Sequence, residues 1–133
     1  MGLLDRLRRK KEKQEQGMSQ RTKITDLEEI CRDDKESYEA LRNTMYLDPR
    51  KIGTSLVDAA KKAKNFEKQG NTVIAKMWYE LAGGLAIYKG DVAKVKEYFG
   101  KCAKLSSDSD YPILKNPEQA IKKAQEYYQK YLT

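Results

Sequence analysis

The sequence predicts an all-α protein, an antiparallel helical bundle or a short helical array of about five helices. Apolar residues recur at three- and four-residue spacing through most of the chain, which is the period of an amphipathic helix. No segment shows the alternation of apolar and polar residues that is typical of a strand. Asp-Pro, Gly-Asn, Gly-Asp and Asn-Pro pairs separate the periodic segments, and such pairs end one helix and begin the next.

The first helix is expected over residues 25–47, where an apolar stripe runs from Leu27 to Met45 and is interrupted at Asp34. Asp48 and Pro49 are expected to end this helix and to begin the second one, as N-cap and first helical residue. The apolar stripe of the second helix consists of Ile52, Leu56, Ala59, Ala60, Ala63 and Phe66, and its solvent stripe of Lys61, Lys64 and Lys68.

The third helix, residues 72–89, follows Gly70-Asn71 and is the most apolar segment of the chain. Because its apolar residues cover more than one face, we expect it at the centre of the fold. Gly83 and Gly84 each disfavour a helix by about 1 kcal/mol relative to Ala, so we expect a close neighbouring helix, with a helix break as the alternative. The apolar residues of this segment are Val73, Ile74, Met77, Trp78, Leu81, Leu85, Ile87 and Tyr88.

The fourth helix is expected over residues 91–105, after Gly90, and the last one begins at Asn116-Pro117, after a long loop. Helices joined by turns of two or three residues pack antiparallel to their neighbours. Trp78 in the third helix and Phe99 in the fourth are expected to organise the core.

The net charge of +7 is concentrated at the N-terminus. Residues 1–23 carry eight basic residues against three acidic ones, whereas the other 110 residues carry 19 against 17. We therefore divide the chain into a basic tail, residues 1–23, expected to be disordered, and a single α-helical domain, residues 24–133. Because Met18 could itself be the start of translation, residues 1–17 need not belong to the native protein.

The alternative for the tail is that it binds an anionic membrane surface or nucleic acid. Three leucines on one face of a short helix and the neighbouring basic cluster would make the contacts: Leu3, Leu4, Leu7, Arg6, Arg8, Arg9, Lys10, Lys11 and Lys13.

The composition argues against catalysis and against a cofactor. The chain has no histidine, which removes His-based triads and most zinc sites, and it has no glycine-rich phosphate-binding loop. Cys31 and Cys102 are isolated, so we expect core packing, with a disulfide in an oxidising compartment as the alternative. No apolar run approaches the roughly 18 residues of a membrane span, and no secretory signal is found. We expect a cytoplasmic protein, with peripheral membrane association through the tail as the alternative.

Residues 75–105 resemble the tetratricopeptide repeat, a helix–turn–helix unit. Trp78, Leu81, Ala82 and Leu85 occupy the positions of its first helix, and Val95, Phe99 and Cys102 fit its second helix loosely. A second frame, through Ala63, Phe66, Ala75 and Tyr79, and an echo at Ala124, Tyr128 and Tyr131 extend the resemblance over about residues 50–132. The resemblance implies packed helical hairpins, in a compact variant or in a chain that self-associates.

The leading function is a non-catalytic protein-interaction module, a small adaptor that binds a protein partner or a second copy in a groove between antiparallel helices. Exposed tyrosines commonly anchor such contacts, and the candidates are Tyr88, Tyr111, Tyr127, Tyr128 and Tyr131. No small-molecule substrate is implied. The alternative function is a membrane-surface or nucleic-acid-associated protein tethered by its tail. A basic face on the domain could also bind nucleic acid, but Arg is scarce there, so we expect a solvated face at Lys61, Lys64, Lys68, Lys94, Lys101 and Lys104.

Overall fold

The structure, a computed structural model, describes residues 26–132. Its elements are α2 (Lys35–Leu41), the 3-10 turn η1 (Pro49–Lys51), α3 (Leu56–Lys68), α4 (Thr72–Lys89), α5 (Val92–Leu105), the 3-10 turn η2 (Pro112–Leu114) and α6 (Pro117–Tyr131). Residues 26–30 form a further helical segment before α2. The described part of the chain contains helices and no strand, so the predicted all-α fold is confirmed.

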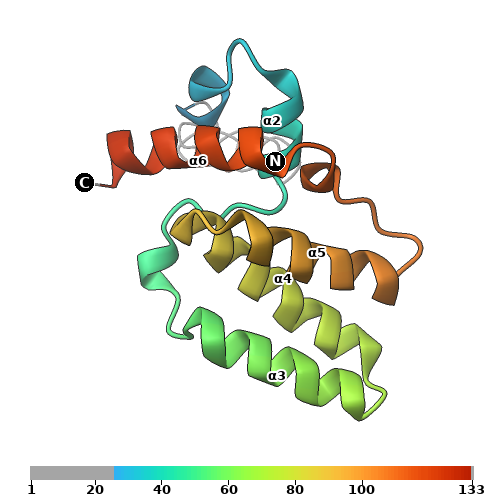
Figure 1. Cartoon of the computed structure of the whole chain (residues 1–133). Coiled ribbons are helices and arrows are strands. Elements are labelled where there is room, and N and C mark those ends of the chain that lie inside the picture. The colour runs from blue at the N-terminus through green and yellow to red at the C-terminus, as the bar shows by residue number, and fades with distance from the viewer. Residues whose placement is uncertain (1–25, 133) are drawn as a thin grey trace, which may run out of the picture.

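Helices α3, α4 and α5 form a layer in which α4 packs on both neighbours (Figure 1). The turns at Gly70-Asn71 and Gly90-Asp91 are too short for any arrangement other than antiparallel packing of consecutive helices. On the far side of α5 from α3 lies α6, which packs on α2 as well as on α4 and α5 (Figure 1).

Helix α4 has the predicted bounds because both of its ends are set by local signals. The side chain of Asn71 accepts a hydrogen bond from the Ile74 amide at 3.4 Å, and Gly90 adopts the left-handed conformation at φ 71°. Its central position is confirmed by a run of buried residues at Ala82, Gly83, Gly84, Leu85, Ala86 and Ile87, in addition to Ala75 and Tyr79.

The two glycines inside α4 allow close contacts on two sides. The helix continues through them, so the expected close contact is found and the alternative, a helix break, is not. A Cβ built on Gly83 would lie 2.6 Å from Cε2 of Phe99, which comes from α5. A Cβ on Gly84 would overlap the ring of Tyr46, which comes from the segment after α2 rather than from a helix. Small residues are needed at both positions.

The single helix expected over residues 25–47 is wrong. The chain leaves the helical conformation after residue 30, and α2 begins anew at Lys35 with Asp34 as its N-cap. The Asp34 carboxylate accepts hydrogen bonds from the Ser37 amide at 3.0 Å and from Nε2 of Gln119 in α6 at 2.9 Å. The contact with Gln119 comes from a distant part of the chain, so it could not be predicted from the local periodicity of apolar residues.

The expected start of the second helix at Pro49 is also wrong. Asp48 caps only the short turn η1, and Ile52 is extended. Arg50 is held by the Asp48 carboxylate at 2.8 Å and by the Leu132 carbonyl at 3.0 Å, and Gly53, a poor helix former, follows. Helix α3 instead begins at Leu56, where the Ser55 hydroxyl accepts a hydrogen bond from the Asp58 amide at 3.1 Å.

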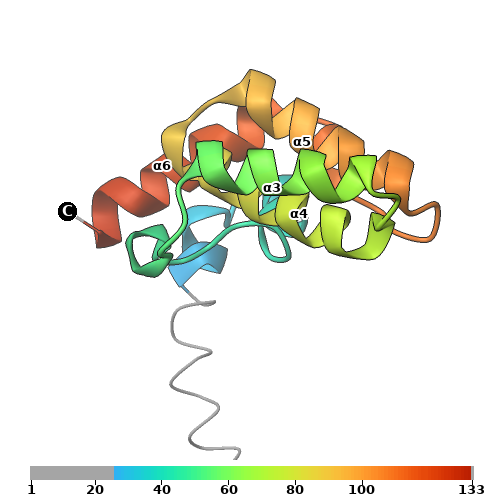
Figure 2. The same ribbon diagram turned by 90° about the horizontal axis from the view of Figure 1, so that it is seen from below.

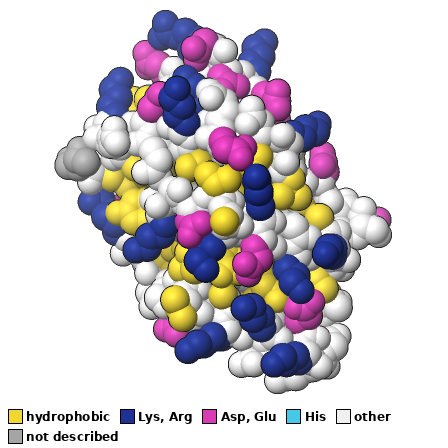
Figure 3. All heavy atoms as spheres, viewed as in Figure 1, with side chains coloured by type: hydrophobic (Ala, Val, Ile, Leu, Met, Phe, Trp, Pro, Cys, Tyr) yellow, Lys and Arg dark blue, Asp and Glu magenta, His cyan; other side chains and the backbone are white. Residues whose placement is uncertain are grey.

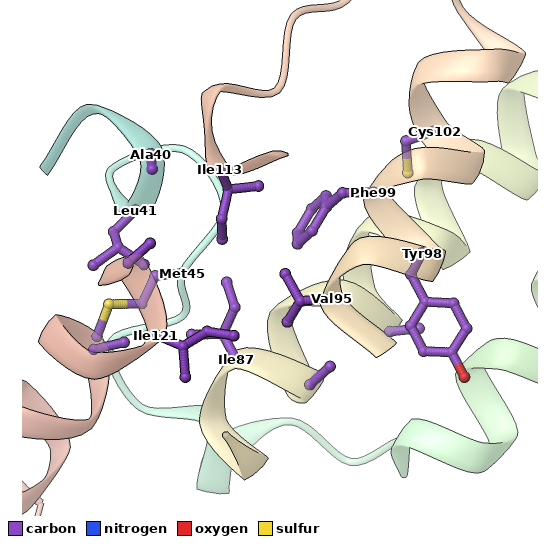
Figure 4. Packing of buried hydrophobic residues seen from close by; sticks show 14 of the residues in the cluster. Ala40, Leu41, Met45, Ile87, Val95, Tyr98, Phe99, Cys102, Ile113 and Ile121 are labelled. Atoms are coloured by element: carbon purple, nitrogen blue, oxygen red, sulfur yellow. The ribbon is translucent and has the colours of Figure 1, made fainter. Parts of the chain in front are cut away.

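The core fills the space between the helical layer and the pair formed by α2 and α6. Figure 4 shows Leu41, Met45 and Ile121 facing Val95 and Phe99, with Ile87 and Ile113 between them. Ile113 belongs to η2, so the long loop before α6 contributes a fully buried residue to the core. Phe99 is 1% exposed, which confirms its expected place in the core.

Candidate protein-interaction surfaces

Two of the five candidate tyrosines lie in the core. Tyr127 is 3% exposed and Tyr128 is 5% exposed. The Tyr128 hydroxyl donates to the Tyr46 carbonyl at 2.6 Å, and burial raises the pKa of this phenol. Both side chains face inward because α6 is packed between α2 on one side and α4 and α5 on the other. The expectation of surface contacts is therefore corrected for these two residues.

The other three tyrosines are half-buried at the edges of the core. The Tyr111 hydroxyl donates to Glu80 at 2.7 Å, and its ring centroid lies 5.7 Å from that of Phe99. Tyr88 packs edge-on against Tyr128, with 5.0 Å between ring centroids. Tyr131 lies beside Tyr127 and lines a hollow with Leu47, Asp48, Arg50, Lys51, Leu132 and Asp26.

Trp78 does not lie in the core as expected. Its ring is half-buried at the boundary between α3 and α4, and the Lys62 ammonium lies 4.6 Å from the ring centroid. A cation over an indole face stabilises a protein by about 0.5–1 kcal/mol at an exposed site. Because Lys62 lies over the ring, it also covers part of the indole face.

Trp78 belongs to an apolar strip on the solvent side of α4, which we call the α4 outer face. Its most exposed members are Val73, at 78%, and Met77, at 58%. The expected central position of this helix therefore does not extend to these two side chains. The strip comprises Val73, Ile74, Met77, Trp78 and Leu81, of which Ile74, Trp78 and Leu81 are half-buried.

Within residues 26–132, the α4 outer face is left uncovered only along the N-terminal half of the helix. Farther along, Tyr46 packs on Gly84, because the chain after α2 passes under α4 there (Figure 2). A hollow lined in part by Asn43, Tyr46, Glu80 and Tyr111 marks the end of the open part. The sequence shows that apolar residues lie all round α4. Only the tertiary structure shows which of these residues are left uncovered.

The two groups of lysines on α3 and α5 are brought together by the fold, and we call them the lysine face. Lys101 of α5 reaches the Glu67 carboxylate of α3 at 3.5 Å. The hydroxyl of Tyr79 donates to the same carboxylate at 2.5 Å, and these contacts lower the Glu67 pKa. In Figure 3, Lys and Arg side chains outnumber acidic ones over the lower part of the molecule, where α3 lies. The lysine face comprises Lys61, Lys64, Lys68, Lys94, Lys101 and Lys104.

Cys31 and Cys102 are free and buried, in agreement with the expected core packing. Burial raises the pKa of the Cys31 thiol to about 11 and that of Cys102 to about 12, so neither is a ready nucleophile. Within residues 26–132 no group of three or more His, Cys, Asp or Glu side chains is arranged to hold a metal ion.

The predicted tail contacts, from Leu3 to Lys13, lie outside the described residues. In the part of the chain that the structure describes, no helix is long and apolar enough to cross a membrane.

The described residues define an all-α protein of packed helical hairpins, with an apolar face that no other residue of 26–132 covers. No protein-family model matches the chain, and no curated protein or solved structure matches it either. The tetratricopeptide resemblance of residues 50–132 therefore stays a prediction.

Proposed function

We propose that this chain is a non-catalytic protein-interaction module, a small adaptor, that binds an amphipathic helix of a partner protein along the α4 outer face. The observation that carries the proposal is the exposure of Val73 and Met77 on a strip of five apolar residues. Contiguous exposed apolar surface is uncommon on a soluble protein and marks interaction sites.

The shape of the strip favours a helix as the partner. Val73, Met77 and Leu81 follow one another at four-residue spacing, so the strip is straight and roughly 12 Å long at about 1.5 Å per residue. This length matches two or three anchor side chains on one face of a helix, which is the recognition mode of helix-in-groove complexes. A second copy of the chain would need an interface of about 800 Å² on each side, more than so short a strip offers.

The energy available at this face suits a reversible contact. Complete burial of a Val or Met side chain contributes about 1.5–3 kcal/mol, and association costs several kcal/mol of translational and rotational freedom. Two such anchors therefore give modest affinity, and flanking contacts from Lys62 and Glu80 would set the orientation of the partner.

The test compares Met77→Glu with Val57→Glu. Val57 is 59% exposed on α3 and lies on the stripe of Lys61, Lys64 and Lys68, away from the α4 outer face, so it is a matched control. Both substitutions are at exposed positions and should change stability by no more than about 0.5 kcal/mol. Tagged full-length chains are expressed in the source cells and purified through the tag, and the proteins that co-purify with each chain are quantified.

We expect Met77→Glu to lose at least one partner that the wild-type chain and Val57→Glu both retain. Equal retention by all three chains would contradict the proposal, because burying the introduced carboxylate against an apolar partner is unfavourable.

A further inference from the structure

The lysine face lies on the opposite side of α4 from the α4 outer face. Met77 and Tyr79 are about 200° apart around the helix axis, and Tyr79 points toward α3 and α5. Figure 2 shows α3 and α5 together on one side of α4. Tyr98 of α5 stacks on Tyr79 with ring centroids 6.2 Å apart, so the two lysine-bearing helices share this side.

The charge on this side is unbalanced. Helix α3 carries four lysines against Asp58 and Glu67, and α5 carries four against Glu97 alone, which leaves a net +5 on the two helices. Two of these eight lysines lie outside the lysine face, because Lys62 lies over Trp78 and Lys96 pairs with Glu118. Among described residues, Lys101 has an ion pair with Glu67, whereas Lys61, Lys64, Lys68 and Lys104 have none. Residues 26–48 carry eight acidic residues against three basic ones, so the nearly neutral domain has two regions of opposite charge.

The chemistry of the lysine face favours carboxylates over nucleic acid. Helices α3 and α5 contain no arginine to grip a phosphate with two hydrogen bonds, and Tyr79 and Tyr98 are too deeply buried to stack on bases. The face already binds one carboxylate of the chain itself, because Glu67 accepts a hydrogen bond from Tyr79 and forms an ion pair with Lys101.

We propose that the lysine face binds a segment of a partner protein that is rich in Asp and Glu. Its carboxylates pair with Lys64, Lys68 and Lys104, which form no ion pair with any described residue, and the net charge of +7 speeds the encounter. Because the two faces lie on opposite sides of α4, the chain can hold an acidic segment and an amphipathic helix together. This second site does not depend on the function proposed for the α4 outer face.

The experiment measures fluorescence anisotropy of a labelled Glu- and Asp-rich peptide with the full-length chain. The test variant is Lys64→Glu/Lys104→Glu, in which both positions are exposed and form no ion pair with a described residue. Two controls make the same change in net charge elsewhere: Lys122→Glu/Lys130→Glu on α6 and Lys10→Glu/Lys11→Glu in the tail. Circular dichroism checks the fold, and Lys64→Gln/Lys104→Gln serves as a milder second variant.

We expect the test variant to weaken peptide binding by about tenfold or more, the glutamine variant to weaken it less, and both controls to weaken it by under about threefold. Wild-type affinity should fall steeply between about 0.01 M and about 1 M ionic strength, where the Debye length shrinks from about 30 Å to about 3 Å. Met77→Glu should leave the peptide affinity unchanged, so failure at one face is distinguishable from failure at the other.

Three results would overturn the proposal. Equal weakening by all of the charge-reversal variants would mean that only net charge matters. Greater weakening by the tail variant would assign acidic ligands to residues 1–23. Tighter, Lys64- and Lys104-dependent binding of a single-stranded or duplex oligonucleotide would assign the face to nucleic acid.

Discussion

Replacing Gly83 by Ala tests how closely α4 and α5 pack. The added Cβ would lie 2.6 Å from Cε2 and 2.7 Å from Cζ of Phe99, distances at which either the ring or the backbone must move. Phe99 is 1% exposed and its ring is packed against Tyr111, so it has little room to move. Gly100 in α5 is the matched control, because a Cβ there meets nothing within 4 Å.

The two substitutions should differ in sign. Ala in place of Gly inside a helix gains about 0.5–1 kcal/mol, and nothing opposes this gain at Gly100. At Gly83 the gain is offset by about 1–3 kcal/mol of overpacking, which leaves a net loss of up to about 2.5 kcal/mol. In a domain of this size, 1 kcal/mol corresponds to a change in Tm of roughly 4–8 °C.

Urea unfolding followed by circular dichroism gives the free energy of unfolding for both variants. A double variant, Gly83→Ala/Phe99→Leu, should be less destabilised than the two single changes added together, because the smaller side chain makes room for the new methyl group. A Gly83→Ala chain that is as stable as Gly100→Ala would refute the close contact between α4 and Phe99.

Two further predictions concern titratable groups. Hydrogen bonds from Ser37 and Gln119 lower the Asp34 pKa, so its contribution to stability is present above about pH 4 and is lost as the pH falls through the folded-state pKa. Asp34→Asn should destabilise the neutral protein and flatten its loss of stability in acid, and an unchanged acid profile in urea unfolding would count against this. Because burial raises the pKa of Cys31 and Cys102, iodoacetamide near neutral pH should modify neither thiol in the folded chain and both in urea. Mass spectrometry that finds a native-state adduct would contradict this expectation and show that the segment around that cysteine opens locally.

The elements that could be predicted from the sequence are those whose ends are set by residues within one turn. Helix α4 ends where Asn71 and Gly90 cap it, and α6 begins where Asn116 precedes Pro117. The breaks at Asp34 and Gly53 were missed because distant contacts help to decide them: Gln119 holds Asp34, and the Leu132 carbonyl holds Arg50.

The candidate surfaces show the same division. The lysine stripe of α3 was predicted, since it depends on the period of one helix. That the lysines of α3 lie on the same side as those of α5 depends on how both helices pack on α4, and this packing cannot be predicted from a local pattern. Tyr127 and Tyr128 were expected among the contact residues, yet both are buried because α6 has neighbours on two sides.

The sequence by itself determined that this protein is helical, where most of its helices end, and that His-based catalysis and histidine-ligated metal sites are excluded. Spacing, capping residues and composition act over one or two turns of chain, so they can be recognised without a structure. Only the tertiary structure decided which apolar residues of α4 stay exposed, because burial depends on what packs against a face. Tyr46 covers Gly84 at one end of that helix, and within residues 26–132 Val73 and Met77 have no such cover at the other.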